Sequence, residues 1–157
     1  METDIEMNTA QTETIHRLDY TVPSFLVDHI DLTFDLAPSA TSVSATTRFK
    51  HNPASDNHEI VLNGQDLELV KIVMNGRTLE KSDYALDHGE LRIPNAPDEV
   101  TLVIDTLVRP DENTSLMGLY ISNGNFFTQC EAEGFRKITY YPDRPDVMAS
   151  YTVTLFA

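Results

Sequence analysis

Alternation of apolar and polar residues is the feature that most constrains how this chain can fold. From Ile30 to Leu36 an apolar side chain stands at every second position, and Val43 to Phe49 repeats the pattern. A period of two places one face of a strand against a core and the other in water. Three more segments are rich in the β-branched and aromatic residues that strands favour: residues 67–73, 100–104 and 151–155.

Dipeptides ending in glycine separate these segments, and Asn-Gly supplies the two positive φ angles that a tight hairpin requires. The sequence predicts such turns at Asn63-Gly64, Asn75-Gly76, His88-Gly89 and Asn123-Gly124. Roughly ten short strands at this spacing are typical of a sandwich or barrel. We expect an all-β fold of two packed antiparallel sheets with minimal helix. One helical turn is predicted near Asp143 to Ala149.

The composition narrows the classes of partner. The formal net charge is −14, from 25 acidic and 11 basic residues. Such a surface repels nucleic acid and anionic membranes, and we expect neither as a partner. It attracts cations such as the free amine of a peptide, although solubility alone is a sufficient reason for the charge. The single cysteine, Cys130, excludes a disulfide framework and a cysteine-rich zinc site.

The two ends of the chain carry their own signals. Met1 to Thr14 are polar and acidic, without the basic start and apolar stretch of a signal peptide. No apolar run is long enough to span a bilayer. We expect a cytoplasmic protein with a disordered extension over residues 1–14 and one folded domain over residues 15–157. The sequence ends directly after an apolar strand pattern, so we expect this domain to be truncated at its C-terminal end.

The sequence predicts neither a catalytic residue nor a metal ligand in this chain. A zinc peptidase needs two histidines one helical turn apart, with a glutamate between them. The run His58-Glu59-Ile60-Val61-Leu62 has Leu62 where the second histidine would stand. The other histidines, at positions 16, 29, 51 and 88, are interpreted as single solvated side chains. Cys130 has no histidine near it in sequence and is interpreted as core filler.

Residues 128–136 form the strongest candidate for a binding site. If the extended conformation of the preceding aromatic segment continues, Gln129 and Glu131 point to the same face. A carboxylate supplies charge to an ammonium group, and an amide carbonyl supplies a second acceptor. Glu133 could join them, or the chain could turn at the glycine that follows. The alternative is a polar strand face on which Arg136 neutralises a nearby glutamate.

A longer run that includes this stretch resembles a known family. From Thr128 to Tyr151 the chain reads Thr-Gln-Cys-Glu-Ala-Glu-Gly-Phe-Arg-Lys-Ile-Thr-Tyr-Tyr-Pro-Asp-Arg-Pro-Asp-Val-Met-Ala-Ser-Tyr. This block is similar to the N-terminal domain of zinc metallo-aminopeptidases of the bacterial aminopeptidase N type, which are gluzincins. Leu62 to Leu67 and Asn113 to Tyr120 stand in the expected order, and the resemblance covers nearly everything after Thr14.

The resemblance implies that this chain is the first, saddle-like domain of a four-domain enzyme that removes N-terminal amino acids from peptides. In the family, a second domain holds the zinc through His-Glu-x-x-His and a downstream glutamate. A Gly-x-Met-Glu-Asn motif in that domain binds the substrate amine. The Gln-x-Glu of the first domain reaches into the catalytic cleft. By position, Glu131 would bind the substrate α-ammonium group, and Gln129 would line the pocket for the first side chain.

This chain departs from the family in lacking both His-Glu-x-x-His and Gly-x-Met-Glu-Asn. The implied zinc therefore belongs to the missing catalytic domain, and we expect the chain alone to be inactive. The implied partners are that domain of the same polypeptide and peptides with a free N-terminus. The alternatives are an autonomous, non-catalytic β-sandwich binding module or a scaffold for assembly. A His-Glu-x-x-His encoded downstream in the same reading frame would distinguish them.

Overall fold

The computed structural model describes residues 16–157, and the predicted disordered extension lies outside them. The described chain is built from strands of two to 11 residues with two 3-10 helical segments. The strands are β1 (Phe25–Asp35), β2 (Thr41–His51), β3 (Ile60–Asn63), β4 (Glu68–Met74), β5 (Arg77–Thr78), β6 (Ala85–Asp87), β7 (Glu90–Ile93), β8 (Glu99–Val108), β9 (Gly118–Ser122), β10 (Asn125–Gln129) and β11 (Ser150–Phe156). The helical segments are η1 (Arg17–Asp19) and η2 (Phe135–Lys137). The all-β prediction is confirmed.

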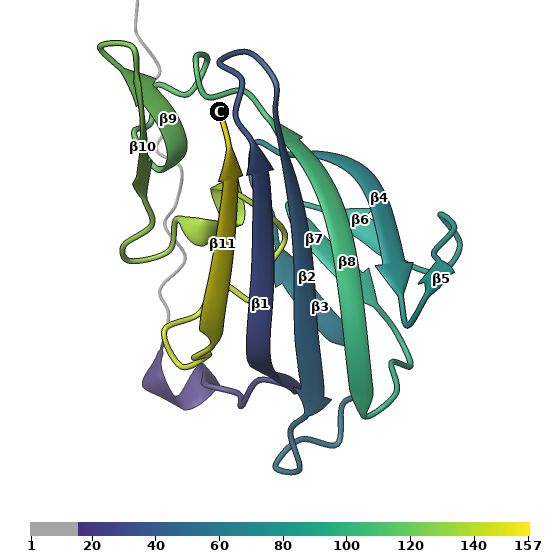
Figure 1. The fold of residues 1–157 in the computed structure, drawn as a ribbon. Helices are drawn as coiled ribbons and strands as arrows, with labels where there is room; N and C mark the ends of the chain where they lie inside the picture. Colours follow the sequence, from purple (N-terminus) through teal and green to yellow (C-terminus); the bar gives the residue numbers. More distant parts are fainter. Residues whose placement is uncertain (1–15) are drawn as a thin grey trace, which may run out of the picture.

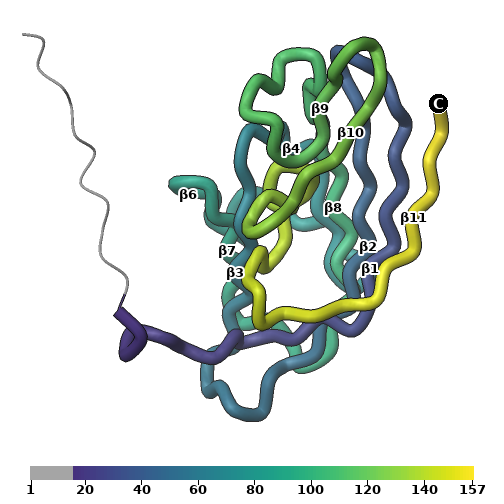
Figure 2. The backbone as a smooth tube through the Cα atoms, turned by 90° about the vertical axis from the view of Figure 1, so that its left-hand side faces the viewer, coloured from purple at the N-terminus to yellow at the C-terminus, as the bar shows by residue number. Residues whose placement is uncertain are grey.

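The strands form two layers and a separate hairpin (Figures 1 and 2). The larger sheet has the order β11-β1-β2-β8-β4-β5, the smaller has the order β3-β7-β6, and β9 pairs with β10. All of these strand pairs are antiparallel except β1 with β11, which is parallel. The expectation of purely antiparallel sheets is therefore wrong at this edge, where β11 arrives after a long connection rather than through a hairpin.

The core lies between the two sheets and follows the predicted alternation. In β2 the buried positions are Thr41, Val43, Ala45, Thr47 and Phe49, which stand at every second residue. One cluster of buried side chains includes members of the larger sheet and of β3 and β7. The period of two in the sequence therefore predicts the inward face of this strand correctly.

Three of the four predicted glycine turns are hairpin turns. Asn75 and Gly76 have φ angles of 50° and 82°, and His88-Gly89 and Asn123-Gly124 also have two positive φ angles. Asn63-Gly64 is the exception, because the chain passes there from β3 to the other sheet. A side chain at Gly64 would place Cβ 2.2 Å from Cε1 of Tyr140, so the glycine serves close packing instead.

The predicted helical turn near Asp143 to Ala149 is one hydrogen-bonded turn rather than a helix. The amide of Val147 donates to the carbonyl of Arg144 at 3.2 Å, and no helix is assigned there. Among residues 16–157 we find no helix of the length and apolar character needed to cross a bilayer.

Candidate functional site

The candidate segment folds into a tight turn where the sequence pattern favours a continuing strand. β10 ends at Gln129, and residues 131–134 form a turn. The amide of Gly134 closes the turn by donating to the carbonyl of Cys130 at 2.9 Å. The extended conformation on which a shared face of Gln129 and Glu131 depends therefore does not continue, and the alternative of a turn at Gly134 is the one found.

Close packing of Gly134 explains why the chain can fold back. A Cβ at this position would lie 2.8 Å from Cα of Cys130 and 2.9 Å from the carbonyl oxygen of Gln129. Both are backbone atoms, which cannot move aside as the end of a flexible side chain can. The turn at residues 131–134 thus depends on a glycine that rests directly against the end of β10.

The turn nevertheless brings Gln129 and Glu131 together. Nε2 of Gln129 donates to the backbone carbonyl of Glu131 at 3.4 Å, and both residues are exposed. Within residues 16–157, the carboxylate of Glu131 has no hydrogen-bond or ion-pair partner. The two predicted site residues are therefore neighbours, and the carboxylate of one is available to a ligand.

Arg136 is engaged by other acidic groups. Its Nε donates to Oδ2 of Asp143 at 2.8 Å, and its Nη2 donates to Oε2 of Glu133 at 2.9 Å. The interpretation of Arg136 as the partner of a nearby glutamate is correct for Glu133 and wrong for Glu131. Since Glu133 is paired, Glu131 alone in this turn offers an unpaired carboxylate.

Asp143 is the residue that fastens the turn to the rest of the domain. It is 8% exposed, and its Oδ2 also accepts from the backbone amide of Arg136 at 3.1 Å. Its own amide donates to Oδ1 of Asn63 at 3.2 Å, at the end of β3. Nearby, the amide of Gln65 donates to the carbonyl of Arg136 at 2.9 Å. Sequence reasoning missed Asp143 because its partners are seven and 80 residues away.

The remaining reactive side chains behave mostly as expected. Cys130 packs against the core as a partly buried residue, and burial, followed by the charge of Asp143, raises the pKa of its thiol. This keeps the thiol protonated at neutral pH and a poor nucleophile. His29 is not a single solvated side chain, because its ring shares hydrogen bonds with Ser150, Thr152 and Asp31.

The run His58 to Leu62 does not fit a peptidase zinc site in the structure either. Leu62 is fully buried in β3, and Glu59 is paired with Arg92 at 3.0 Å. The segment is extended, whereas the His-Glu-x-x-His arrangement needs a helix to bring its histidines to one face. This run therefore cannot supply the ligands for the zinc that an aminopeptidase requires.

A family model decides how this domain is classified. The model described as Peptidase M1 N-terminal domain matches residues 26–157. The chain belongs to this family. It is 43% identical over 151 residues to aminopeptidase N of Caulobacter vibrioides, which covers 96% of this chain and 17% of that protein. It is also 43% identical over 149 residues to aminopeptidase N of Escherichia coli, and this match covers 95% of this chain and 17% of that protein.

Solved structures agree with the family assignment. The crystal structure of Legionella pneumophila aminopeptidase A in complex with aspartic acid has a TM-score of 0.82 at 35% identity, covering 89% of this chain and 17% of that one. An M1 zinc metallopeptidase from Deinococcus radiodurans has a TM-score of 0.70 at 16% identity, and the match covers 85% of this chain and 32% of that one. This likeness shows the shared fold. The described M1 N-terminal domain thus spans about a sixth of the aminopeptidases it matches.

Proposed function

We propose that this chain is the N-terminal domain of a zinc aminopeptidase, in which Glu131 binds the α-ammonium group of the peptide substrate. The observation that carries the proposal is the exposed carboxylate of Glu131, which has no partner among residues 16–157. The turn that presents it is fixed by Arg136 and Asp143. A charged acceptor on a fixed scaffold binds a cation without the cost of ordering a mobile segment.

Gln129 takes a supporting role in the proposal. Its amide nitrogen already donates to the backbone of Glu131, so the carbonyl oxygen of the side chain remains as an acceptor. An ammonium group has three donors and no acceptor. A carboxylate and an amide oxygen side by side therefore suit its chemistry better than that of a neutral or anionic group.

This arrangement explains how an exopeptidase would select the end of a chain. A free N-terminus carries a positive charge that pairs with Glu131, whereas an acylated peptide leaves that carboxylate unpaired and desolvated. In the intact polypeptide, zinc would supply the Lewis acid for hydrolysis from ligands outside this chain. The contribution of residues 129 and 131 is to bind and orient the substrate.

We infer that another part of the full-length polypeptide packs against the β10–β11 groove, an apolar depression of about 420 Å³. The groove is lined by Phe34, Leu119, Phe127, Tyr151, Val153 and Leu155, among others. It adjoins the candidate site, since Thr128 and Cys130 also line it. Exposed apolar surface of this kind is typical of an interface, and the matched aminopeptidases are about six times longer than the region they share with this chain.

The test of the ammonium site is Glu131→Ala in the full-length polypeptide that carries this domain. At ~4 Å and an effective dielectric constant near 20, an ion pair is worth about 4 kcal/mol before desolvation. Removing one partner of a buried charged pair typically costs about 2–5 kcal/mol. Steady-state kinetics normalised to zinc content should therefore show kcat/KM lower by roughly one and a half to three and a half powers of ten.

Glu133→Ala is the matched control, because it removes a carboxylate from the same turn. In its ion pair with Arg136 the glutamate side chain is 55% exposed, so the pair is worth about 1 kcal/mol of stability, and kcat/KM should remain near that of the parent. Gln129→Ala should lower kcat/KM by an amount between those of the two glutamate variants, because loss of a neutral acceptor costs roughly 1 kcal/mol. A value of kcat/KM within twofold of the parent for Glu131→Ala would refute the ammonium-binding role.

A further inference from the structure

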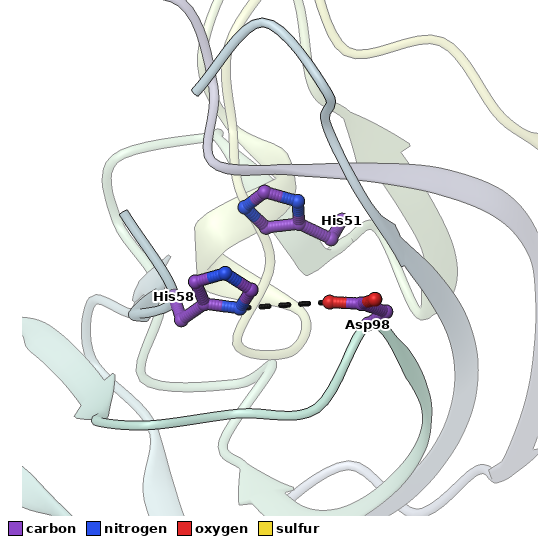
Figure 3. A group of neighbouring side chains, drawn as sticks. All are labelled: His51, His58 and Asp98. Atoms are coloured by element: carbon purple, nitrogen blue, oxygen red, sulfur yellow. Dashed lines mark ion pairs between the residues drawn. The ribbon is translucent and has the colours of Figure 1, made fainter. Parts of the chain in front are cut away.

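Two neighbouring histidines and an aspartate from a later segment of the sequence meet at one end of the sandwich (Figure 3). His51 ends β2, His58 lies in the loop before β3, and Asp98 directly precedes β8. One ring nitrogen of each histidine and one carboxylate oxygen of Asp98 lie within 4.8 Å of one another. This cluster is separate in sequence and in the fold from the turn that carries Glu131.

Backbone hydrogen bonds hold the three segments of the cluster in place. The amide of His51 donates to the carbonyl of Asp98 at 2.7 Å, which ties the end of β2 to the start of β8. The amide of Ala96 donates to the carbonyl of His58 at 2.8 Å, which ties the loop to the same segment. The side chains therefore converge because of the fold and not through a chance contact of flexible loops.

The side-chain geometry leaves a nitrogen lone pair of His51 for a ligand. Nε2 of His51 lies 3.2 Å from the carbonyl oxygen of Asn57, so the ring carries its proton there and keeps its lone pair on Nδ1. A backbone carbonyl that fixes the tautomer in this way is typical of metal-binding histidines. Nδ1 of His58 lies 3.7 Å from Oδ1 of Asp98.

We propose that His51, His58 and Asp98 form a binding site for a borderline divalent transition-metal ion such as zinc. Two imidazoles and one carboxylate match the preference of Zn²⁺, Ni²⁺ and Cu²⁺, whereas Mg²⁺ and Ca²⁺ prefer oxygen ligands alone. His58 and Asp98 have side chains that are 46% and 80% exposed, so water can complete the coordination shell. The proposal reverses the expectation, drawn from sequence spacing, that this chain binds no metal.

Metal binding requires the two rings to leave their parallel stack so that one nitrogen of each points to the same ion. The rings of His51 and His58 are stacked with their centroids 4.0 Å apart and an angle of 1° between their planes. A metal ion lies in the plane of each ring that binds it, and ligand nitrogens on a tetrahedral ion are about 3.4 Å apart for bonds of about 2.1 Å. Because His58 is half exposed, its ring can turn toward a shared ion with little resistance from neighbours.

Calorimetric titration of the tag-free 157-residue chain with zinc chloride tests the site. We expect one ion per chain. His51→Ala and His58→Ala should each weaken binding by at least about tenfold, since even outer partners of metal ligands contribute 10–100-fold. Asp98→Asn should also weaken it. His88→Ala is the matched control, because His88 is an exposed histidine beside one aspartate, Asp87, and should leave binding unchanged.

Nuclear magnetic resonance of the parent chain gives a second measurement that needs no variant. Zinc should shift the imidazole resonances of His51 and His58 and leave those of His29 and His88 in place. Absence of a binding signal at millimolar zinc, or undiminished binding by the His51→Ala/His58→Ala double variant, would overturn the proposal. Binding lost equally in His88→Ala would also overturn it, because it would indicate scattered surface binding.

Discussion

Strands β8 and β11 carry the same alternating pattern in sequence but differ completely in burial. In β8, Val100, Leu102 and Ile104 are at most 2% exposed. In β11, Tyr151, Val153 and Leu155 are 49%, 53% and 61% exposed. The pattern in each strand correctly indicates an apolar face, but only one of these faces is covered within the described chain.

The difference lies in what surrounds each strand. β8 pairs with β2 on one side and β4 on the other, and its apolar side chains belong to the core shared with the smaller sheet. Within residues 16–157, β11 pairs only with β1, and its register sets Tyr151 beside Ile30 and Val153 beside Leu32. Its apolar residues thus face the core side, but they border the β10–β11 groove instead of a packed layer. Alternation identifies the inward face, and tertiary neighbours decide how far it is buried.

The largest expected effect is that of Leu102→Ala in the middle of β8. Leu102 is fully buried, so the substitution removes apolar contacts and leaves a cavity that the surrounding strands cannot close. The free energy of unfolding of the 157-residue chain, measured in urea, should fall by about 2–5 kcal/mol. A loss below about 1 kcal/mol would mean that β8 is packed no better than β11.

An intermediate effect is expected at the outer side of β11. The ring of His29 lies 2.7 Å from Oγ of Ser150 and 3.1 Å from Oγ1 of Thr152, so it links β1 to β11. His29→Ala should lower the local stability of β11 by about 1–2 kcal/mol. Hydrogen exchange should accelerate for amides in β11 and remain unchanged in β8, with His88→Ala as the control. Equal acceleration in both strands would contradict a local link.

The smallest effect is expected for Leu155→Ala at the exposed face of β11. Because Leu155 is mostly solvated, the free energy of unfolding of this chain should change by no more than about 0.5 kcal/mol. The same substitution in the full-length polypeptide should cost at least about 1 kcal/mol if another domain covers the groove. Equal small effects in both proteins would count against docking at this surface.

The sequence predicts most of the strands because their signals are local. Alternation over Ile30 to Leu36 is confirmed in β1 up to Asp35, and Asn-Gly pairs mark two of the hairpins. The sequence leaves the turn that carries Glu131 as one of two alternatives, because the deciding contact is the packing of Gly134 against Cys130, Gln129 and the side chain of Met117. The aromatic pair Phe126-Phe127 favours a strand that could continue, and no local pattern reports how closely a glycine packs.

Residue types are enough to identify the candidate ammonium site, but they do not show which acidic side chain pairs with Arg136. Gln129 and Glu131 stand out by their chemistry, and their places as binding residues remain a prediction. Which of the two glutamates Arg136 engages depends on the position of the whole turn relative to Asp143. The histidine cluster escapes sequence reasoning for a similar reason. His51 and His58 lack the i, i+4 spacing of a zinc motif, and Asp98 joins them only through the pairing of β2 with β8.

The close fit of Gly134 has a practical consequence for mutational scanning. A methyl group there would press on the backbone of two neighbouring residues and push the turn outward. In a screen of the intact polypeptide for activity, position 134 would then score like a substrate contact although it has no side chain to offer. Sensitivity to substitution along this segment therefore has two sources. It reports direct contact with the peptide, and it equally reports how the turn holds the carboxylate of Glu131 in position.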